Sequence, residues 1–224
     1  MCDQGCGIFV NAGAIFSQAK RAAERASAAG SSSTELRDNV LVAVVFSVLG
    51  AEAIFNEMLL MAQIGLRGYE RNATPPEVRR FVSLASELAA RSSLMLKYRI
   101  AKLAFPGDTY EAEDALIEDF AKLIELRNTP VHAKSDRIYS VGKGKEKIER
   151  PPIVAKLQPM GVLACMDGVI GDWIRLISTP AVAKWACNAT ANIVGDVVRS
   201  IPDCDLRQRM DLFCFRFGAF DPIL

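Results

Sequence analysis

The sequence contains a single histidine, His132, among 224 residues. Metal sites built from several histidines are therefore not available to this chain. None of the six cysteines forms a CxxC pair, so a zinc knuckle is not indicated either. Charge of neither sign dominates, because 27 basic residues balance 26 acidic ones. We therefore expect no metal and no cofactor, and any contact with nucleic acid would need a local basic patch.

The N-terminus lacks a basic stretch followed by an apolar run, so the sequence predicts no secretory leader and a cytoplasmic location. The cysteines are then expected to be reduced thiols, and only Cys2 and Cys6 are close enough to suggest redox chemistry. The longest apolar segment, residues 40–64, carries Glu52, Asn56 and Glu57 near its middle. A lipid-facing helix tolerates such residues poorly, so we expect a soluble protein with this helix buried in it.

Hydrophobic residues recur at helical spacing along most of the chain. Prolines at the starts of segments, such as Pro76 and Pro180, suit the first turn of a helix. We therefore predict an all-α bundle of about six helices, in one domain over residues 1–224 with a core at about 38–202. The predicted helices cover residues 8–29, 35–64, 77–103, 110–127, 159–177 and 180–201.

Residues 134–152, after the fourth predicted helix, form the one clear non-helical insertion. Two glycines interrupt it, and the flanking residues allow a small β-hairpin. The insertion is either a solvated loop whose lysines keep it soluble, or a cationic lip that holds a phosphate backbone. The candidate RNA-binding residues are Lys134, Arg137, Lys143, Lys145 and Lys147.

The chain ends in a tail, residues 203–224, that is apolar at alternate positions between Leu212 and Phe217. Such a tail could fold back on the bundle or contribute to an interface between two copies. The sequence leaves both alternatives open.

Arg127 and Asn128 precede the single histidine, His132, at the end of the fourth predicted helix. Histidine exchanges protons near neutral pH, and arginine is a fixed planar cation suited to phosphate oxygens. In an unbroken helix, positions 127 and 132 would lie roughly 7.5 Å apart along the axis and about 140° apart around it. Pro130 predicts a kink or restart between Asn128 and His132 that could bring both groups to one phosphate.

These residues resemble the signature of the HEPN domain, which is an arginine, a polar residue and a histidine four to six residues after the arginine. The sequence Glu52-Ala-Ile-Phe-Asn56 resembles the Glu-x-x-x-Asn on the long early helix of these bundles. Lys97-Tyr98 resembles the Lys-Tyr that closes the next helix in several HEPN groups. The resemblance covers about residues 38–202.

The resemblance implies metal-independent cleavage of RNA by a homodimer that joins two motifs in one cleft, often in toxin–antitoxin or antiviral systems. It assigns Arg127 to the charged transition state, His132 to general acid–base catalysis and Asn128 to orienting the pair. Glu52 and Asn56 would support the site, or be purely structural. Toxins silenced by a nucleotidyltransferase often have a tyrosine two residues after the histidine, where this chain has Lys134, so nucleotidylation is not expected.

Two alternatives to an enzyme remain at this point. A non-catalytic HEPN-like module would bind RNA, a nucleotide or a protein partner such as an antitoxin, and needs only the cationic lip. In a purely structural protein, Arg127 and His132 would only cap a helix, and His132 would be buried or paired with the backbone.

Overall fold

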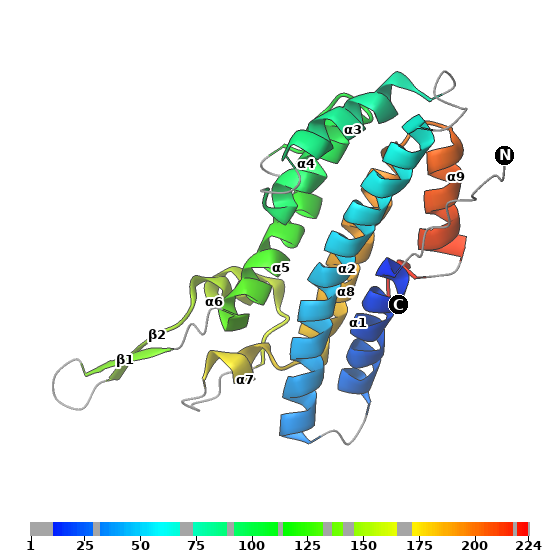
Figure 1. The fold of residues 1–224 in the computed structure, drawn as a ribbon. Helices are drawn as coiled ribbons and strands as arrows, with labels where there is room; N and C mark the ends of the chain where they lie inside the picture. Colours follow the sequence, from blue (N-terminus) through cyan, green and yellow to red (C-terminus); the bar gives the residue numbers. More distant parts are fainter. Residues whose placement is uncertain are drawn as a thin grey trace.

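In the computed structural model, the chain forms a helical bundle with one β-hairpin projecting from it (Figure 1). The structure describes residues 11–28, 32–67, 74–88, 92–111, 114–131, 136–140, 146–164, 172–216 and 219–223. The predicted all-α class is confirmed, and the insertion does contain a small hairpin. The elements are α1 (Ala12–Ser27), α2 (Ser33–Arg67), α3 (Pro76–Leu88), α4 (Leu94–Ala104), α5 (Ala115–Val131), β1 (Arg137–Ser140), β2 (Glu146–Glu149), α6 (Pro152–Leu157), a 3-10 turn (Gln158–Met160), α7 (Trp173–Ile177), α8 (Pro180–Ser200), α9 (Asp205–Asp211) and a π turn (Leu212–Arg216).

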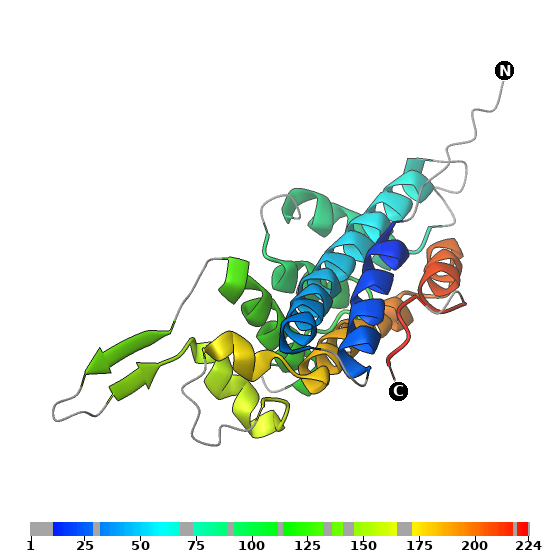
Figure 2. The same cartoon turned by 90° about the horizontal axis from the view of Figure 1, so that it is seen from below.

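Helix α2 is the long axis of the bundle, and 35 residues at 1.5 Å each span roughly 50 Å. It lies between α1 and α3–α5, with α8 packed behind it (Figures 1 and 2). Small residues allow α1 to approach α2 closely. A Cβ on Gly50 would lie 2.9 Å from the Cβ of Phe16, so only glycine fits at this crossing. The buried alanines of α1 are Ala12, Ala19, Ala22, Ala23 and Ala26.

Helix α8 is predicted almost to the residue, because its start signals are local. Thr179 is the N-cap, and its hydroxyl accepts a hydrogen bond from the Val182 amide at 3.1 Å. Pro180 occupies the first turn, where its missing N–H has no intrahelical partner to lose.

The single helix predicted over residues 77–103 is wrong. The structure has two helices here, α3 and α4, which pack as an antiparallel pair. Ser93 is the reason for the second start, because its hydroxyl caps α4 by accepting from the Leu96 amide. Arg80 of α3 donates from Nε to the Ala104 carbonyl at 2.9 Å, which satisfies an orphan acceptor at the end of α4.

The helix predicted over residues 159–177 is also wrong. The 3-10 turn ends at Gly161, whose φ of 66° is left-handed and suits only glycine without strain. Helical structure resumes at Trp173, where Asp172 caps α7 by accepting from the Arg175 amide at 2.8 Å. Residues 165–171 lie outside the described part of the chain.

The sequence predicted a kink or a restart between Asn128 and His132. No restart occurs within the described part of α5, because the helix runs through Pro130 to Val131. A proline costs most in a helix interior, where it removes one backbone hydrogen bond and crowds the carbonyl four residues earlier. Here it is followed by only one more helical residue, so little of the helix is disturbed. The preceding residue, Thr129, also keeps its side chain in the helix by donating to the Glu125 carbonyl at 2.8 Å.

The tail folds back on the bundle, which was one of the two alternatives left open by the sequence. The ring of Phe220 stacks on that of Phe16, with centroids 4.6 Å apart and planes 2° apart. Asn188 of α8 makes two hydrogen bonds to the backbone of Ile223, so α8 also holds the end of the tail.

Helix α2 is long and apolar enough to cross a membrane by length and composition alone. However, 56% of its most apolar 18-residue window is buried inside the bundle. The buried part of α2 packs against α1 and α8, so the helix forms part of the core of this bundle.

Glu57 of α2 caps the N-terminus of α1. Its Oε1 accepts from the Asn11 amide at 2.6 Å and from the Ala12 amide at 3.0 Å. Its Oε2 is buried without a hydrogen-bond partner. Burial raises the pKa of the Glu57 carboxyl above its usual 4.5, although the two amide hydrogen bonds act in the opposite direction.

The raised pKa predicts a pH-dependent difference in stability between the wild type and Glu57→Gln. The folded protein binds the Glu57 proton more tightly than the unfolded chain does. Protonated Glu57 therefore stabilises the folded state fully below about pH 4.5, and this stabilisation is lost as pH rises through the raised pKa. Glutamine keeps an acceptor oxygen but does not titrate. Between pH 4 and 7, the melting temperature of Glu57→Gln should therefore increase relative to that of the wild type as pH rises. Glu57→Ala, which removes the cap, should cost about 1 kcal/mol, and a pH-independent difference for Glu57→Gln would contradict the argument.

Candidate functional site

The last turns of α5 position the first two residues of the predicted catalytic motif. Leu123 and Leu126 are fully buried and anchor one face of α5 in the core. This orientation leaves Arg127 and Asn128 half-buried at the margin of the core. The motif arginine is therefore held by a rigid helix and not by a loop.

Arg127 has no ion pair or hydrogen bond to any described residue, and its Nε is buried. Leaving a buried polar group unpaired typically costs about 1–3 kcal/mol, so such a group calls for a partner from solvent or from a ligand. A guanidinium offers five donors in a fixed fork that matches phosphate oxygens. The local environment of Arg127 is thus suited to an anion.

The base of the hairpin lies beside α6 and α7 (Figures 1 and 2), and α6 packs on α5. Asp136, just before β1, accepts from the Trp173 amide at 2.9 Å and so ties the hairpin to the start of α7. Its other oxygen, Oδ1, is buried without a partner, and so is Nε of Arg150, just after β2. In the described part of the chain, three of the six buried polar side-chain atoms without partners belong to this end of the molecule.

A salt bridge holds α6 against α5, because Lys156 Nζ lies 2.5 Å from Glu125 Oε2. Both side chains are partly exposed, so this pair contributes little to stability but fixes the relative position of the helices. The end of α6, where Lys156 lies, is thus close to the last turns of α5, which carry Arg127.

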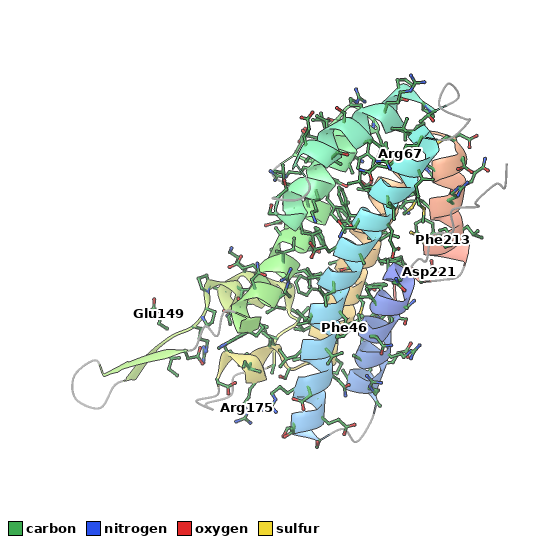
Figure 3. All side chains as sticks on the ribbon, in the orientation of Figure 1. Phe46, Arg67, Glu149, Arg175, Phe213 and Asp221 are labelled. Carbon is green, nitrogen blue, oxygen red and sulfur yellow. The ribbon has the colours of Figure 1, made fainter. Side chains whose placement is uncertain are left out.

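The other predicted motif residue, His132, lies outside the described residues, as do Lys134, Lys143 and Lys145. The remaining two candidates for RNA binding, Arg137 and Lys147, lie in the hairpin strands. The strands pair antiparallel, with Arg137 opposite Glu149 and Tyr139 opposite Lys147. Glu149 lies on the hairpin away from the bundle, while Arg175 of α7 lies beside α2 (Figure 3).

Glu52 and Asn56 are brought together by the structure, and Lys97 is their common partner. Lys97 Nζ lies 3.1 Å from Glu52 Oε1 and 3.5 Å from Asn56 Oδ1. The Lys97 side chain is only 7% exposed, so the carboxylate compensates a nearly buried charge. The adjacent Tyr98 donates to the Ala51 carbonyl at 2.9 Å, and burial raises the pKa of its phenol.

These four residues therefore fasten α4 to α2. Lys97 lies in the first half of α4, so the Lys-Tyr pair does not close a helix as the resemblance implied. The contacts of Glu52 and Asn56 are those of a structural tie, which was one of the two alternatives for them.

The sequence does not reveal the roles of Asp136, Trp173 and Lys156 at this end of the molecule. Asp136 and the amide it accepts from are 37 residues apart, and Lys156 and Glu125 are 31 residues apart. No local pattern links residues at such separations. Among the described residues there is also no group of three His, Cys, Asp or Glu side chains that could hold a metal ion.

Comparison of the chain with protein-family models, with curated proteins and with solved structures gives no match. The fold and the site together define a class of protein: an all-α bundle with a small hairpin and a half-buried arginine, Arg127, that has no partner among the described residues.

Proposed function

We propose that this protein is a metal-independent endoribonuclease of HEPN type. The observation that supports the proposal most is the state of Arg127, whose buried Nε has no partner in the described part of the chain. The basic hairpin begins only a few residues after α5 ends. An arginine that served only as a helix cap would be expected to donate to a carbonyl, and Arg127 donates to none among the described residues.

The proposed chemistry divides one phosphodiester cleavage between two side chains. His132 removes the proton from the ribose 2′-OH as O2′ attacks phosphorus, or returns a proton to O5′ as the P–O5′ bond breaks. Arg127 stabilises the extra negative charge that develops on the phosphate oxygens. Asn128 orients the pair. The products are a 2′,3′-cyclic phosphate and a 5′-hydroxyl end.

The test of this function is incubation of the purified protein with mixed RNA in EDTA. We expect cleavage to persist in EDTA and to leave 2′,3′-cyclic phosphate ends, which a cyclic-phosphate-specific ligation detects. RNA that stays intact, or cleavage that stops when EDTA is added, would contradict the proposal.

We further propose a cytoplasmic homodimer that acts in toxin–antitoxin or antiviral defence, with an antitoxin as a further protein partner. The outer face of α2 supports a second copy, because Leu49 and Leu60 are 38% and 45% exposed. Eleven residues are close to three whole turns, so both leucines lie on one face of the helix. A stable pair should bury about 1,000 Å² or more in total, and sedimentation at micromolar concentration would reveal it.

The hairpin provides a separate prediction about RNA binding. Replacing Lys143, Lys145 and Lys147 with glutamine should weaken RNA binding. It should also make the slope of log K against log salt concentration shallower by roughly 0.7 for each phosphate that is no longer neutralised. Binding measured from 50 to 300 mM salt checks the slope. The matched control replaces three cations with glutamine at exposed positions on other helices, Arg21 of α1, Arg99 of α4 and Lys184 of α8. An unchanged slope in the hairpin variant would place the RNA elsewhere.

If the hairpin variant loses RNA binding but the wild type never cleaves RNA, the non-catalytic alternative is favoured. If the hairpin variant still cleaves RNA but its binding depends less steeply on salt, the endoribonuclease proposal is supported.

A further inference from the structure

We propose that a cavity at the C-terminal end of α2 binds a small molecule with an apolar body and one positively charged group. The cavity has a volume of about 320 Å³ and lies where the end of α2, the start of α3 and the start of α9 meet. These elements come together at the upper end of the bundle in Figure 1, and Arg67 marks the end of α2 in Figure 3. This volume lies within the range of about 300–1,000 Å³ typical of small-molecule sites. The site is separate from α5 and the hairpin, so the inference does not rest on the proposed ribonuclease function.

The inner wall of the cavity is apolar. Met61 of α2, Val78 of α3 and Leu206 of α9 line it, and each is almost fully buried. Methionine adapts its shape to an irregular ligand more readily than a branched side chain does. This wall would cover an aliphatic or aromatic body but could not satisfy a buried polar group.

Gly65 keeps the cavity open on the α2 side. A Cβ placed on Gly65 would have no atom within 4 Å, so empty space adjoins the helix backbone here. Glycine inside a helix is roughly 0.5–1 kcal/mol less favourable than alanine. The residue therefore leaves room for a ligand at a small cost to the helix.

The rim of the cavity carries one negative charge in excess. Two carboxylates, Asp203 and Asp205, and one guanidinium, Arg209, line it. Arg209 Nε lies 2.6 Å from Asp205 Oδ2, so these two neutralise each other. Asp203 is exposed and makes no ion pair or hydrogen bond to a described residue. A cation seated on the apolar wall would find its partner in Asp203, while an anion would be repelled.

Cys204 lines the same cavity and makes its occupancy measurable. Its thiol is free and partly exposed. A ligand in the cavity should shield this thiol from a small alkylating reagent such as iodoacetamide. The rate of alkylation at Cys204, read by peptide mass spectrometry, then reports binding without interference from other cysteines.

Three probes with one apolar body test the proposal: 2-phenylethylamine, the neutral 2-phenylethanol and the anion phenylacetate. At about 0.3 kcal/mol per non-hydrogen atom, a probe of about nine such atoms binds with a Kd of roughly 10 mM, so each is titrated to about 30 mM with the full-length protein. The amine should slow alkylation of Cys204 most and phenylacetate least. Alkylation that the amine does not slow, or equal protection by all three probes, would overturn the proposal.

Two variants locate the binding. Gly65→Leu should fill the cavity and abolish protection by the amine, and Gly65→Met provides the same test if the first variant fails to fold. Asp203→Asn should weaken binding of the amine by up to about fivefold, which is the effect of losing an exposed ion pair. The affinity for 2-phenylethanol should stay unchanged. Asp221→Asn, an exposed acid outside the cavity, is the matched control. Protection that survives in well-folded Gly65 variants would also overturn the proposal.

Discussion

His132→Ala and Arg127→Ala are each expected to lower RNA cleavage by about 10² to 10⁴-fold, and the double variant should lose little more. Removing a general acid–base or a preorganised charge stabiliser typically has an effect of about this size. Two groups that act in one transition state are strongly non-additive, because the second has little left to stabilise once the first is gone. Cleavage rates of the four proteins on one RNA in EDTA measure this.

The same variants separate catalysis from structure. Arg127 is only half-buried and has no partner to lose in the described residues, so Arg127→Ala should change the melting temperature little. Arg99→Ala, an exposed arginine on α4, is the matched control and should keep full activity. Wild-type cleavage by His132→Ala would refute the ribonuclease proposal. A sharp fall in its melting temperature would instead assign His132 a structural role.

Phe16→Ala is expected to have the largest effect on stability, about 3–5 kcal/mol. The ring is fully buried, lies against the backbone of Gly50, and stacks on Phe220 from the tail. Its loss would open a cavity where α1, α2 and the tail meet. For a chain of this size, about 2–4 °C is lost per kcal/mol, so thermal unfolding should show a fall of roughly 6–20 °C.

A double-mutant cycle with Phe220→Ala tests whether the tail packs on the bundle in solution. Stacked aromatic pairs couple by about 0.5–1.5 kcal/mol, so the double variant should lose less than the two single losses combined. Leu103→Ala, at an exposed position of α4, is the control and should have a small effect. Additive losses would mean that the tail does not contact Phe16.

Elements with local signals are predictable in this protein. The start of α8 follows from Thr179 and Pro180, which act through their own backbone and the next turn. Helix α2 follows from a long apolar segment, and the hairpin follows from the glycines within the insertion. The candidate motif is likewise recognised from the spacing of residues in the sequence alone.

The helix boundaries that were predicted wrongly lie where a local start or stop signal competes with a continuous helical pattern. Ser93 starts a new helix inside an otherwise continuous helical pattern, because its capping hydrogen bond and the packing of α3 on α4 outweigh continuation. Gly161 stops a pattern that hydrophobic spacing alone would extend. Pro130 does not start a new helix within the described residues, because a helix already anchored by Leu126 tolerates a proline near its end.

The sequence by itself determined the all-α class, the long central helix, and the chemistry available at Arg127. Tertiary structure alone decided which polar groups are paired. Glu52 meets Lys97 across 45 residues, and Glu57 caps a helix that begins 45 residues before it. Arg127 is left without a partner among the described residues, while the Glu52 carboxylate compensates a more deeply buried lysine. Charges find partners according to which helices pack together, and that packing depends on the whole core.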